Sequence, residues 1–308
     1  MNHAVIDLGS NSIRLSIYDC INDQVTKVFN RKEFVGLVSY VSNGNLDIEG
    51  TQKACEVLNS FKETAVKYVE VSNVHLFATA SLRNLSNKDE AIRIITDQTK
   101  LVPDVLDGKE EAALGFSGAS RFANCDNGVM IDIGGASTEL VLFKDYKVVE
   151  LISLPIGCLN LSLDYVSEII PNAHEMKRIK AVINDQLSPI NWSKNISYPL
   201  MVGVGGTIRA ALKLSRALFN LSPEENSIDA SYIKEINGLL KSRKKNIYHT
   251  LYKHTPERLL TFPTGLAILQ QAIKTFGCET IFVSKYGLRE GYLMDRVLKV
   301  NCKSDVND

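Results

Sequence analysis

Short apolar runs alternate along the chain with longer stretches in which apolar residues recur at helical spacing. In the first half, this pattern predicts strands at 4–19 (a hairpin), 25–30, 74–79 and 105–106, and helices at 48–69, 88–99 and 108–122. In the second half, it predicts a second hairpin from about 130, strands at 199–204 and 280–284, and helices at 175–187, 208–219, 231–241, 264–276 and 288–300. Strands that alternate with helices indicate an α/β fold.

The opening hairpin occurs twice. Residues 5–15 read VIDLGSNSIRL, and residues 130–140 read MIDIGGASTEL. The identical pairs are Ile6 and Ile131, Asp7 and Asp132, Gly9 and Gly134, Ser12 and Ser137, and Leu15 and Leu140. We therefore expect duplicated α/β domains around a central cleft, with the boundary at the turn-like stretch 125–128. The expected domains are 1–124 and 125–308, with the last helix, about 288–300, a candidate to pack back on the first domain.

Composition narrows the class of protein. A chain of 308 residues is long for one core, so two domains of about 150 residues are the default. It has 35 basic and 35 acidic residues, so global charge does not favour a nucleic-acid or membrane partner. The cysteines are scattered without a close pair, which favours free thiols in a reducing cytoplasm. No signal peptide or membrane span is evident, so we expect a cytoplasmic protein.

The first hairpin tip joins a carboxylate to small residues. Asp7 ends an apolar strand, and Gly9, Ser10, Asn11 and Ser12 follow it. Consecutive backbone N–H groups in such a turn form an anion-binding concavity, and Asp7 could hold a divalent ion or its water shell. An ordinary Asp–Gly hairpin turn is the alternative, which the second copy makes less attractive.

The second tip has two carboxylates. Asp132 and Glu139 flank a turn formed by Gly134, Gly135, Ala136, Ser137 and Thr138, so both could converge on one cation. For Glu139 the alternative is a strand residue that faces solvent. If the two tips faced each other, they would suit a metal-bound phosphate chain.

Two further stretches are candidates for chemistry. Gly205, Gly206 and Thr207 end a strand and open a helix, where free N–H groups attract phosphate, although a simple tight turn is the alternative. Glu110 and Glu111 open another helix. A first-turn anion accounts for Glu110, whereas Glu111 could be a general base for water. Basic candidates for phosphate binding are Arg14, Arg83, Arg209, Arg258 and Arg289.

Six motifs together resemble a known family. They are DLGSNSIR at 7–14, ATASLR at 78–83, GKEEA at 108–112, DIGGASTE at 132–139, GGT at 205–207 and YGLREG at 286–291. In this order they resemble the exopolyphosphatase and guanosine pentaphosphate phosphohydrolase family. That family lies within the superfamily of actin-like proteins, sugar kinases and chaperone ATPases. The resemblance covers most of the chain and is closest to the short, two-domain form.

The resemblance implies an α/β protein with two ribonuclease-H-like (actin-like) domains that flank a Mg²⁺-dependent phosphohydrolase site. It implies that Glu111 is the catalytic base, that Asp132 and Glu139 are metal-site carboxylates, and that Asp7 lies opposite them. The turns at 9–12, 134–138 and 205–207 would bind phosphates, together with Arg14 and Arg83. Three departures stand out, because the family usually has glycine at Ala136, serine at Gly205 and serine at Asp107.

The leading hypothesis is an exopolyphosphatase that removes the terminal phosphate of inorganic polyphosphate. The alternative is a hydrolase of the 5′-terminal phosphate of the alarmone pppGpp, which presents the same kind of phosphate chain. More distant alternatives are a phosphotransferase of the same superfamily and a non-catalytic sensor of polyphosphate or alarmone. The sensor would be expected to lack Glu111, Asp132 or Glu139, all of which are present. Whether the protein forms a homodimer stays open.

Overall fold

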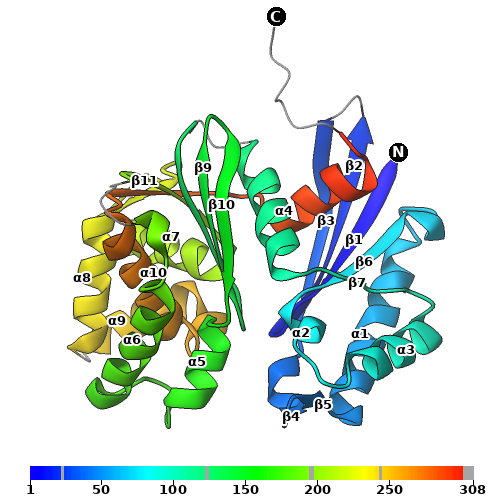
Figure 1. Ribbon diagram of the computed structural model, residues 1–308, viewed down its shortest axis with the longest axis horizontal. Helices are drawn as coiled ribbons and strands as arrows, with labels where there is room; N and C mark the ends of the chain where they lie inside the picture. The colour runs from blue at the N-terminus through cyan, green and yellow to red at the C-terminus, as the bar shows by residue number, and fades with distance from the viewer. Residues whose placement is uncertain (22–23, 122–124, 194–197, 243–244, 301–308) are drawn as a thin grey trace, which may run out of the picture. The chain divides into compact units, whose positions relative to one another are not determined.

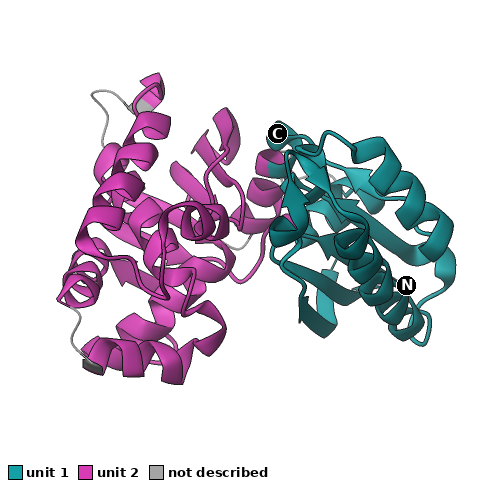
Figure 2. Cartoon of the chain, turned by 90° about the horizontal axis from the view of Figure 1, so that it is seen from below, with its two compact units in different colours: residues 1–111, 289–303 teal, residues 112–288, 304–308 magenta. Residues whose placement is uncertain are grey.

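The computed structural model describes residues 1–21, 24–121, 125–193, 198–242 and 245–300. The chain forms two compact units (Figure 2). Unit 1 comprises Met1–Glu111 and the segment that begins at Arg289, and unit 2 comprises Ala112–Leu288. This division falls inside helix α4 (Gly108–Ser120), earlier than the predicted boundary between 124 and 125. The reason is that the apolar side chains of Ala112, Phe116 and Ala119 pack in a core cluster with strands of unit 2.

Unit 1 is built on one mixed five-stranded sheet, in the order β3-β2-β1-β6-β7 (Figure 1). Its strands are β1 (Asn2–Leu8), β2 (Ser12–Ile21), β3 (Gln24–Phe34), β6 (Val74–Ala78) and β7 (Asp104–Val105). Strands β1, β2 and β3 are antiparallel neighbours, whereas β6 and β7 run parallel to β1. Alternate residues of β1 and β2 project into a core with α1 (Ile48–Ala65) and α3 (Lys88–Thr99).

The other face of this sheet carries polar residues and is covered by the C-terminal segment. That segment forms α11 (Leu288–Gly291) and a π-helical turn, η5 (Tyr292–Val297). The ring of Tyr292 packs on Phe77 of β6, with 4.8 Å between ring centroids. The hydroxyl of the fully buried Tyr18 donates to Glu290 at 2.7 Å. The segment is thus an integral part of unit 1.

Unit 2 repeats the arrangement around a six-stranded sheet, in the order β10-β9-β8-β11-β13-β12. Its strands are β8 (Gly128–Ile133), β9 (Thr138–Lys144), β10 (Lys147–Leu154), β11 (Leu200–Val204), β12 (Ser227–Asp229) and β13 (Thr280–Val283). Its helices include α5 (Cys158–Tyr165), α6 (Ala173–Leu187), α7 (Gly205–Phe219), α8 (Ala230–Lys241), α9 (Lys245–His254) and α10 (Phe262–Phe276). One sheet face packs on these helices and the other on α4, so unit 2 has two apolar clusters.

The two sheets match in register as well as in order. Asp7 on β1 lies opposite Arg14 on β2, and Asp132 on β8 lies opposite Glu139 on β9. These are the positions that the sequence repeat aligns. The predicted α/β class and the predicted duplication are therefore confirmed.

Most predicted elements occur within a few residues of their predicted bounds. Pattern analysis missed β10, α5, α9 and β12, and the predicted helix at 288–300 is α-helical only as far as Gly291. The side chain of Asn87, at the start of α3, makes no cap hydrogen bond: its amide group bonds both backbone groups of Leu46 instead. The cysteines of the described chain are free thiols, as predicted, and Cys302 lies outside the described residues. Among the described helices, none has the length and apolar character needed to cross a membrane.

Candidate functional site

The tip of the first hairpin is held by the chain that follows β3. The carbonyl of Ser10 accepts from the backbone N–H of Val38 at 3.2 Å. The carbonyl of Asn11 accepts from those of Val35 and Gly36 at 3.2 and 3.0 Å. The described peptide bonds are all trans, so the N–H of a peptide unit points away from its C=O. The N–H groups of Asn11 and Ser12 therefore point to the opposite side of the turn.

The tip of the second hairpin is held in an equivalent way by the start of α5. The carbonyl of Gly134 accepts from the N–H of Cys158 at 3.0 Å, and that of Gly135 accepts from Leu159 and Asn160 at 2.8 and 3.1 Å. The side-chain amide of Asn160 donates to the carbonyl of Ala136 at 3.3 Å. By the same planarity, three successive N–H groups, those of residues 135, 136 and 137, point away from α5. Such a row is an anion-binding concavity.

The first glycine of each tip is required by a close backbone approach. A Cβ atom on Gly9 would lie 3.0 Å from the carbonyl oxygen of Ser12. A Cβ atom on Gly134 would lie 3.0 Å from the carbonyl oxygen of Ser137, and here the Gly134 N–H donates to that oxygen at 2.9 Å. The repeat therefore preserves a backbone shape as well as a sequence.

Two carboxylates lie on neighbouring strands beside the second tip. Asp132 and Glu139 are directly opposite each other, so their side chains project from the same face of the sheet. Glu139 is buried, with 2% of its surface exposed, and accepts from the hydroxyl of Ser153 at 2.8 Å. The alternative of a solvent-facing Glu139 is therefore wrong.

The third glycine turn, at residues 205–207, lies against the carboxylate of Asp132. Gly205 has φ +94°, and a Cβ atom there would lie 2.6 Å from Oδ1 of Asp132. Residues 132 and 205 are brought together because β8 and β11 are parallel neighbours, with Asp132 next to Val204 in the register. A side chain at position 205 would collide with the carboxylate of Asp132, so this turn requires glycine.

The guanidinium group of Arg258 packs against Gly206, the next residue of that turn. A Cβ atom on Gly206 would lie 1.7 Å from a guanidinium nitrogen of Arg258, so the backbone there and the guanidinium are in direct contact. Arg258 is buried, and its Nη1 lies 4.0 Å from Sγ of Cys158 at the start of α5. This cation joins the turn at 205–207 to the helix that holds the second tip.

Two threonine hydroxyls among the predicted phosphate-binding residues face the protein interior. The hydroxyl of Thr138 donates to the carbonyl of Ile156 at 2.6 Å. Thr207 is fully buried, and a Cβ atom on Gly265 of α10 would lie 2.6 Å from its Oγ1. The backbone N–H groups at these positions are thus better candidates for phosphate contacts than the hydroxyls.

The predicted base lies in unit 1 and is ion-paired. Nη1 of Arg83 donates to Oε2 of Glu111 at 2.6 Å, and the two side chains are 17% and 11% exposed. The neighbouring Glu110 belongs to the helix cap: its carboxylate accepts from the N–H of Asp107, and Asp107 accepts from the N–H groups of Lys109 and Glu110. The cap fixes the start of α4 and thereby the place of Glu111.

Asp7 is flanked by cations. Nε of Arg289 lies 4.0 Å from its carboxylate, and Arg14 is its cross-strand neighbour. Burial raises the pKa of Asp7, and the charges of Arg289 and Arg14 offset part of that rise. Two guanidinium groups disfavour a metal cation beside Asp7, so the surroundings of Asp132 and Glu139 suit a metal better.

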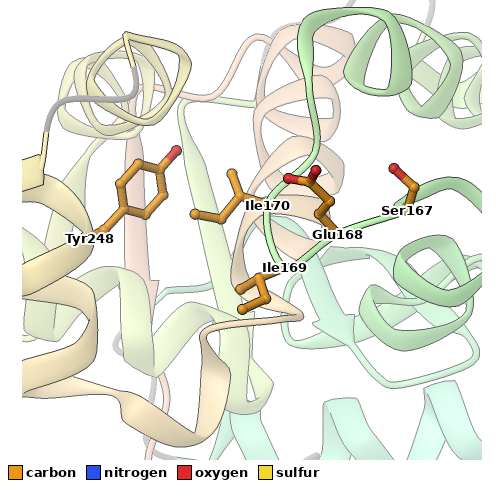
Figure 3. Close-up of a pocket in the computed structure, with 5 residues that line it drawn as sticks. All are labelled: Ser167, Glu168, Ile169, Ile170 and Tyr248. Carbon is orange, nitrogen blue, oxygen red and sulfur yellow. The ribbon is translucent and has the colours of Figure 1, made fainter.

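A surface pocket in unit 2 lies apart from these residues. It has a volume of about 750 Å³ and is lined by Ser167, Glu168, Ile169, Ile170 and Tyr248 (Figure 3). The side chain of Ser167 is committed to Glu175, and the hydroxyl of Tyr248 to the carbonyl of Leu240. A lining whose only charged member is acidic does not suit a phosphate chain.

Sequence reasoning missed the elements that hold the tips. The sequence did not predict a role in the site for the start of α5 or for the residues that contact the first tip. Gly157 followed by Asn160 at the third helical position was an available signal, since the Asn160 side chain accepts from the Gly157 N–H at 2.7 Å. The contacts of residues 35–38 had no comparable signal.

Comparisons with known proteins agree on one family. A model described as the Ppx/GppA phosphatase family matches residues 16–300. The bifunctional 3-dehydroquinate synthase/phosphatase of Fusobacterium nucleatum is 30% identical, with 96% of this chain and 46% of the relative covered. The guanosine-5′-triphosphate,3′-diphosphate pyrophosphatase of Aliivibrio fischeri is 27% identical, with 94% and 58% covered. The chain thus spans about half the length of these relatives.

Solved structures share the fold along nearly the whole chain. A Ppx/GppA family member from Aquifex aeolicus has a TM-score of 0.79 and 27% identity, with 98% of this chain and 99% of that chain covered. An exopolyphosphatase from Cytophaga hutchinsonii has a TM-score of 0.86 at 22% identity, with 98% and 99% covered. At that identity, the second match bears on the fold alone.

Proposed function

Because the chain belongs to the Ppx/GppA phosphatase family, we propose that it hydrolyses the terminal phosphoanhydride bond of a phosphate chain, with inorganic polyphosphate as the first candidate. The observation that carries this proposal is the pair of hairpin tips. Each has its carbonyls held on one side and its N–H groups turned to the other, beside an aspartate. Such preorganised donors neutralise charge that develops on phosphoryl oxygens in the transition state.

In this proposal the attacking water is held by Glu111. A carboxylate can accept a proton from water as the new P–O bond forms, and general bases of this kind typically contribute 10²–10⁴-fold. The hydrogen bond from Arg83 restricts the orientation of the Glu111 carboxylate.

A Mg²⁺ ion is proposed as the cofactor, held by Asp132 and Glu139. Among the described residues, no group of three or more His, Cys, Asp or Glu could hold a metal ion. Asp132 and Glu139 offer two carboxylates from one sheet face, and Mg²⁺ commonly binds through one or two carboxylates and completes its shell with substrate phosphates and water. When bound, the ion would supply positive charge next to the phosphate oxygens.

The second candidate substrate is pppGpp. It is favoured by the similarity to the guanosine-5′-triphosphate,3′-diphosphate pyrophosphatase of Aliivibrio fischeri. Polyphosphate ranks first because the contacts described above all suit phosphate oxygens. The same residues would act in both reactions.

The test is phosphate release with Mg²⁺ from short polyphosphate, long polyphosphate and pppGpp, with ATP as a fourth substrate. We expect release from polyphosphate and its near loss in Glu111→Gln. The matched control is Glu56→Gln, an exposed glutamate of α1, which should keep wild-type activity. Preference for pppGpp would favour the second candidate. No phosphate release from any of the four substrates would refute the hydrolase proposal and would favour a sensor or a phosphotransferase.

A further inference from the structure

Equivalent rows of residues in the two sheets differ in charge. In unit 1, Asp7, Arg14 and Lys32 lie side by side across β1, β2 and β3. In unit 2, the corresponding row across β8, β9 and β10 is Asp132, Glu139 and Ser153. The first residue of each row is the same aspartate, but a cation replaces the glutamate at the second position and another cation replaces the serine at the third.

Residues paired directly across antiparallel strands project from the same face of the sheet. The contacts of unit 1 agree with this expectation. Arg289 approaches Asp7 and also donates to Ser16 and Asn30, which form the next row on that face. Arg14 reaches Ser12 on the same face at 3.5 Å, at the edge of the predicted phosphate-binding turn.

The unit 1 row places two cations next to each other. Like charges directly opposite on neighbouring strands are destabilising, and an anion bound beside both cations would offset that cost. The row in unit 2 has the complementary character, since its two carboxylates suit a cation. One duplicated backbone thus carries a row with two cations in unit 1 and a row with two carboxylates in unit 2.

The two lysines of β3 lie at different ends of the strand. Lys27 lies 2.5 Å from the buried carboxylate of Glu290. The ammonium of Lys32 lies 3.6 Å from the ring centroid of Phe34, which is the cross-strand neighbour of Ser12. The aromatic ring therefore keeps the ammonium at the end of the strand where the hairpin turns.

We propose that Lys32 binds a phosphate of the substrate chain next to Arg14, so that the two cations form a subsite for a phosphate away from the cleaved bond. This inference rests on the proposed function and names a residue that sets the affinity of the protein for the phosphate chain of its substrate. An ammonium is a compact charge that suits phosphate oxygens without a fixed geometry. Because the contact is to a phosphate that does not react, it lowers KM more than it raises kcat.

The experiment measures binding of inorganic tripolyphosphate with Mg²⁺ by calorimetry, in the Glu111→Gln protein so that turnover does not interfere. We expect Lys32→Gln to weaken binding about tenfold and Lys32→Arg to restore most of it, since the charge is kept. The matched control is Lys67→Gln, an exposed lysine of unit 1 outside the sheet. Steady-state kinetics of Lys32→Gln alone should show a raised KM with kcat nearly unchanged.

The outcomes separate this inference from the proposed function. Unchanged tripolyphosphate affinity in Lys32→Gln, or no tripolyphosphate binding before the lysine is replaced, overturns the role of Lys32. Lys32-dependent binding by a protein that hydrolyses none of the four substrates upholds the subsite and refutes the hydrolase. A melting temperature of Lys32→Gln equal to that of wild type excludes a loss of folding as the cause.

Discussion

Nη1 of Arg83 donates to the carboxylate of Glu111 at 2.6 Å and also to the carbonyl of Leu106 at 3.1 Å. One nitrogen thus ties the proposed base to the loop that precedes its own helix. The sequence places Arg83 among the phosphate ligands, whereas the geometry of unit 1 gives it a direct contact with the base. These two roles affect different kinetic constants.

We predict that Arg83→Met lowers kcat by about tenfold or more while KM changes by less than about threefold, because the orientation of Glu111 is lost. Steady-state kinetics on polyphosphate check this. The control is Arg93→Met on α3, whose side chain is 70% exposed and should have no effect. A raised KM with unchanged kcat would instead support the phosphate contact.

Gly205 is predicted to be intolerant of any side chain. Gly205→Ala would place a methyl group 2.6 Å from the carboxylate of Asp132 at a φ of +94°. We expect a loss of about 1–3 kcal/mol in unfolding free energy and a fall in activity, because both the backbone and Asp132 must shift. Urea unfolding and phosphate release measure the two effects. Gly238→Ala on α8 is the control, since no heavy atom other than those of its chain neighbours and its own helix backbone lies within 4 Å of its Cβ position. Equal losses in the two variants would contradict the steric argument.

The buried Tyr18 is predicted to stabilise the C-terminal segment on unit 1. Its hydroxyl and Lys27 both contact Oε1 of Glu290. Burial raises the pKa of Glu290, but the charges of Arg289 and Lys27 outweigh it, so the pKa is lowered and the carboxylate stays ionised. Tyr18→Phe removes one hydrogen bond to this charge and should cost about 1–3 kcal/mol.

Thermal or urea unfolding of Tyr18→Phe provides the measurement. Tyr252→Phe, at a tyrosine that is 64% exposed, is the matched control and should be neutral. If both variants unfold like the wild type, the network adds nothing to stability.

A histidine pair predicts acid sensitivity. Nδ1 of His3 and Nε2 of His75 lie 3.2 Å apart. Burial lowers the pKa of both, and that of His75 falls from 6.5 to about 4. The unfolded chain therefore binds a proton as the pH falls below 6.5, while folded His75 does not bind one until about pH 4. Stability is lost across that window as the pH falls.

The measurement is the urea midpoint of wild type and His75→Gln between pH 6.5 and about 4. Because His75 is only partly buried, we expect the variant to lose about 1–2 kcal/mol less than wild type over that range. His249→Gln, at an exposed histidine, should follow the wild type. Parallel curves for all three proteins would contradict the prediction.

The sequence predicted the parts of the fold that depend on local patterns. The matched hairpins around Asp7 and Asp132 indicated duplicated sheets, because an apolar strand, a small-residue turn and a second strand are contiguous in the chain. Helix α5 escaped prediction because its eight residues are too few to show a clear period. The last helix was predicted as regular, but its segment from Tyr292 is π-helical, and the ring of Tyr292 packs on Phe77, a contact that local pattern does not reveal.

The candidate site was predicted as a set of residues rather than as a set of contacts. Motif spacing identified Glu111, Asp132, Glu139 and the glycine turns, but it held no information on which side chains meet. The ion pair of Arg83 with Glu111 and the contact of Gly205 with Asp132 join segments that are distant in sequence. The same is true of the buried position of Glu139, which follows from strand register across β8, β9 and β10.

The way in which the hairpin tips are held has a consequence for the thermodynamics of binding. Each tip is fixed by a short stretch of chain within its own unit, residues 35–38 for the first and the start of α5 for the second. The turns are therefore ordered when the units fold, and the entropy of fixing their backbone is spent before any ligand arrives. An anion that binds there meets N–H groups that are already aligned, so its association needs little loop ordering and should carry only a small unfavourable conformational entropy.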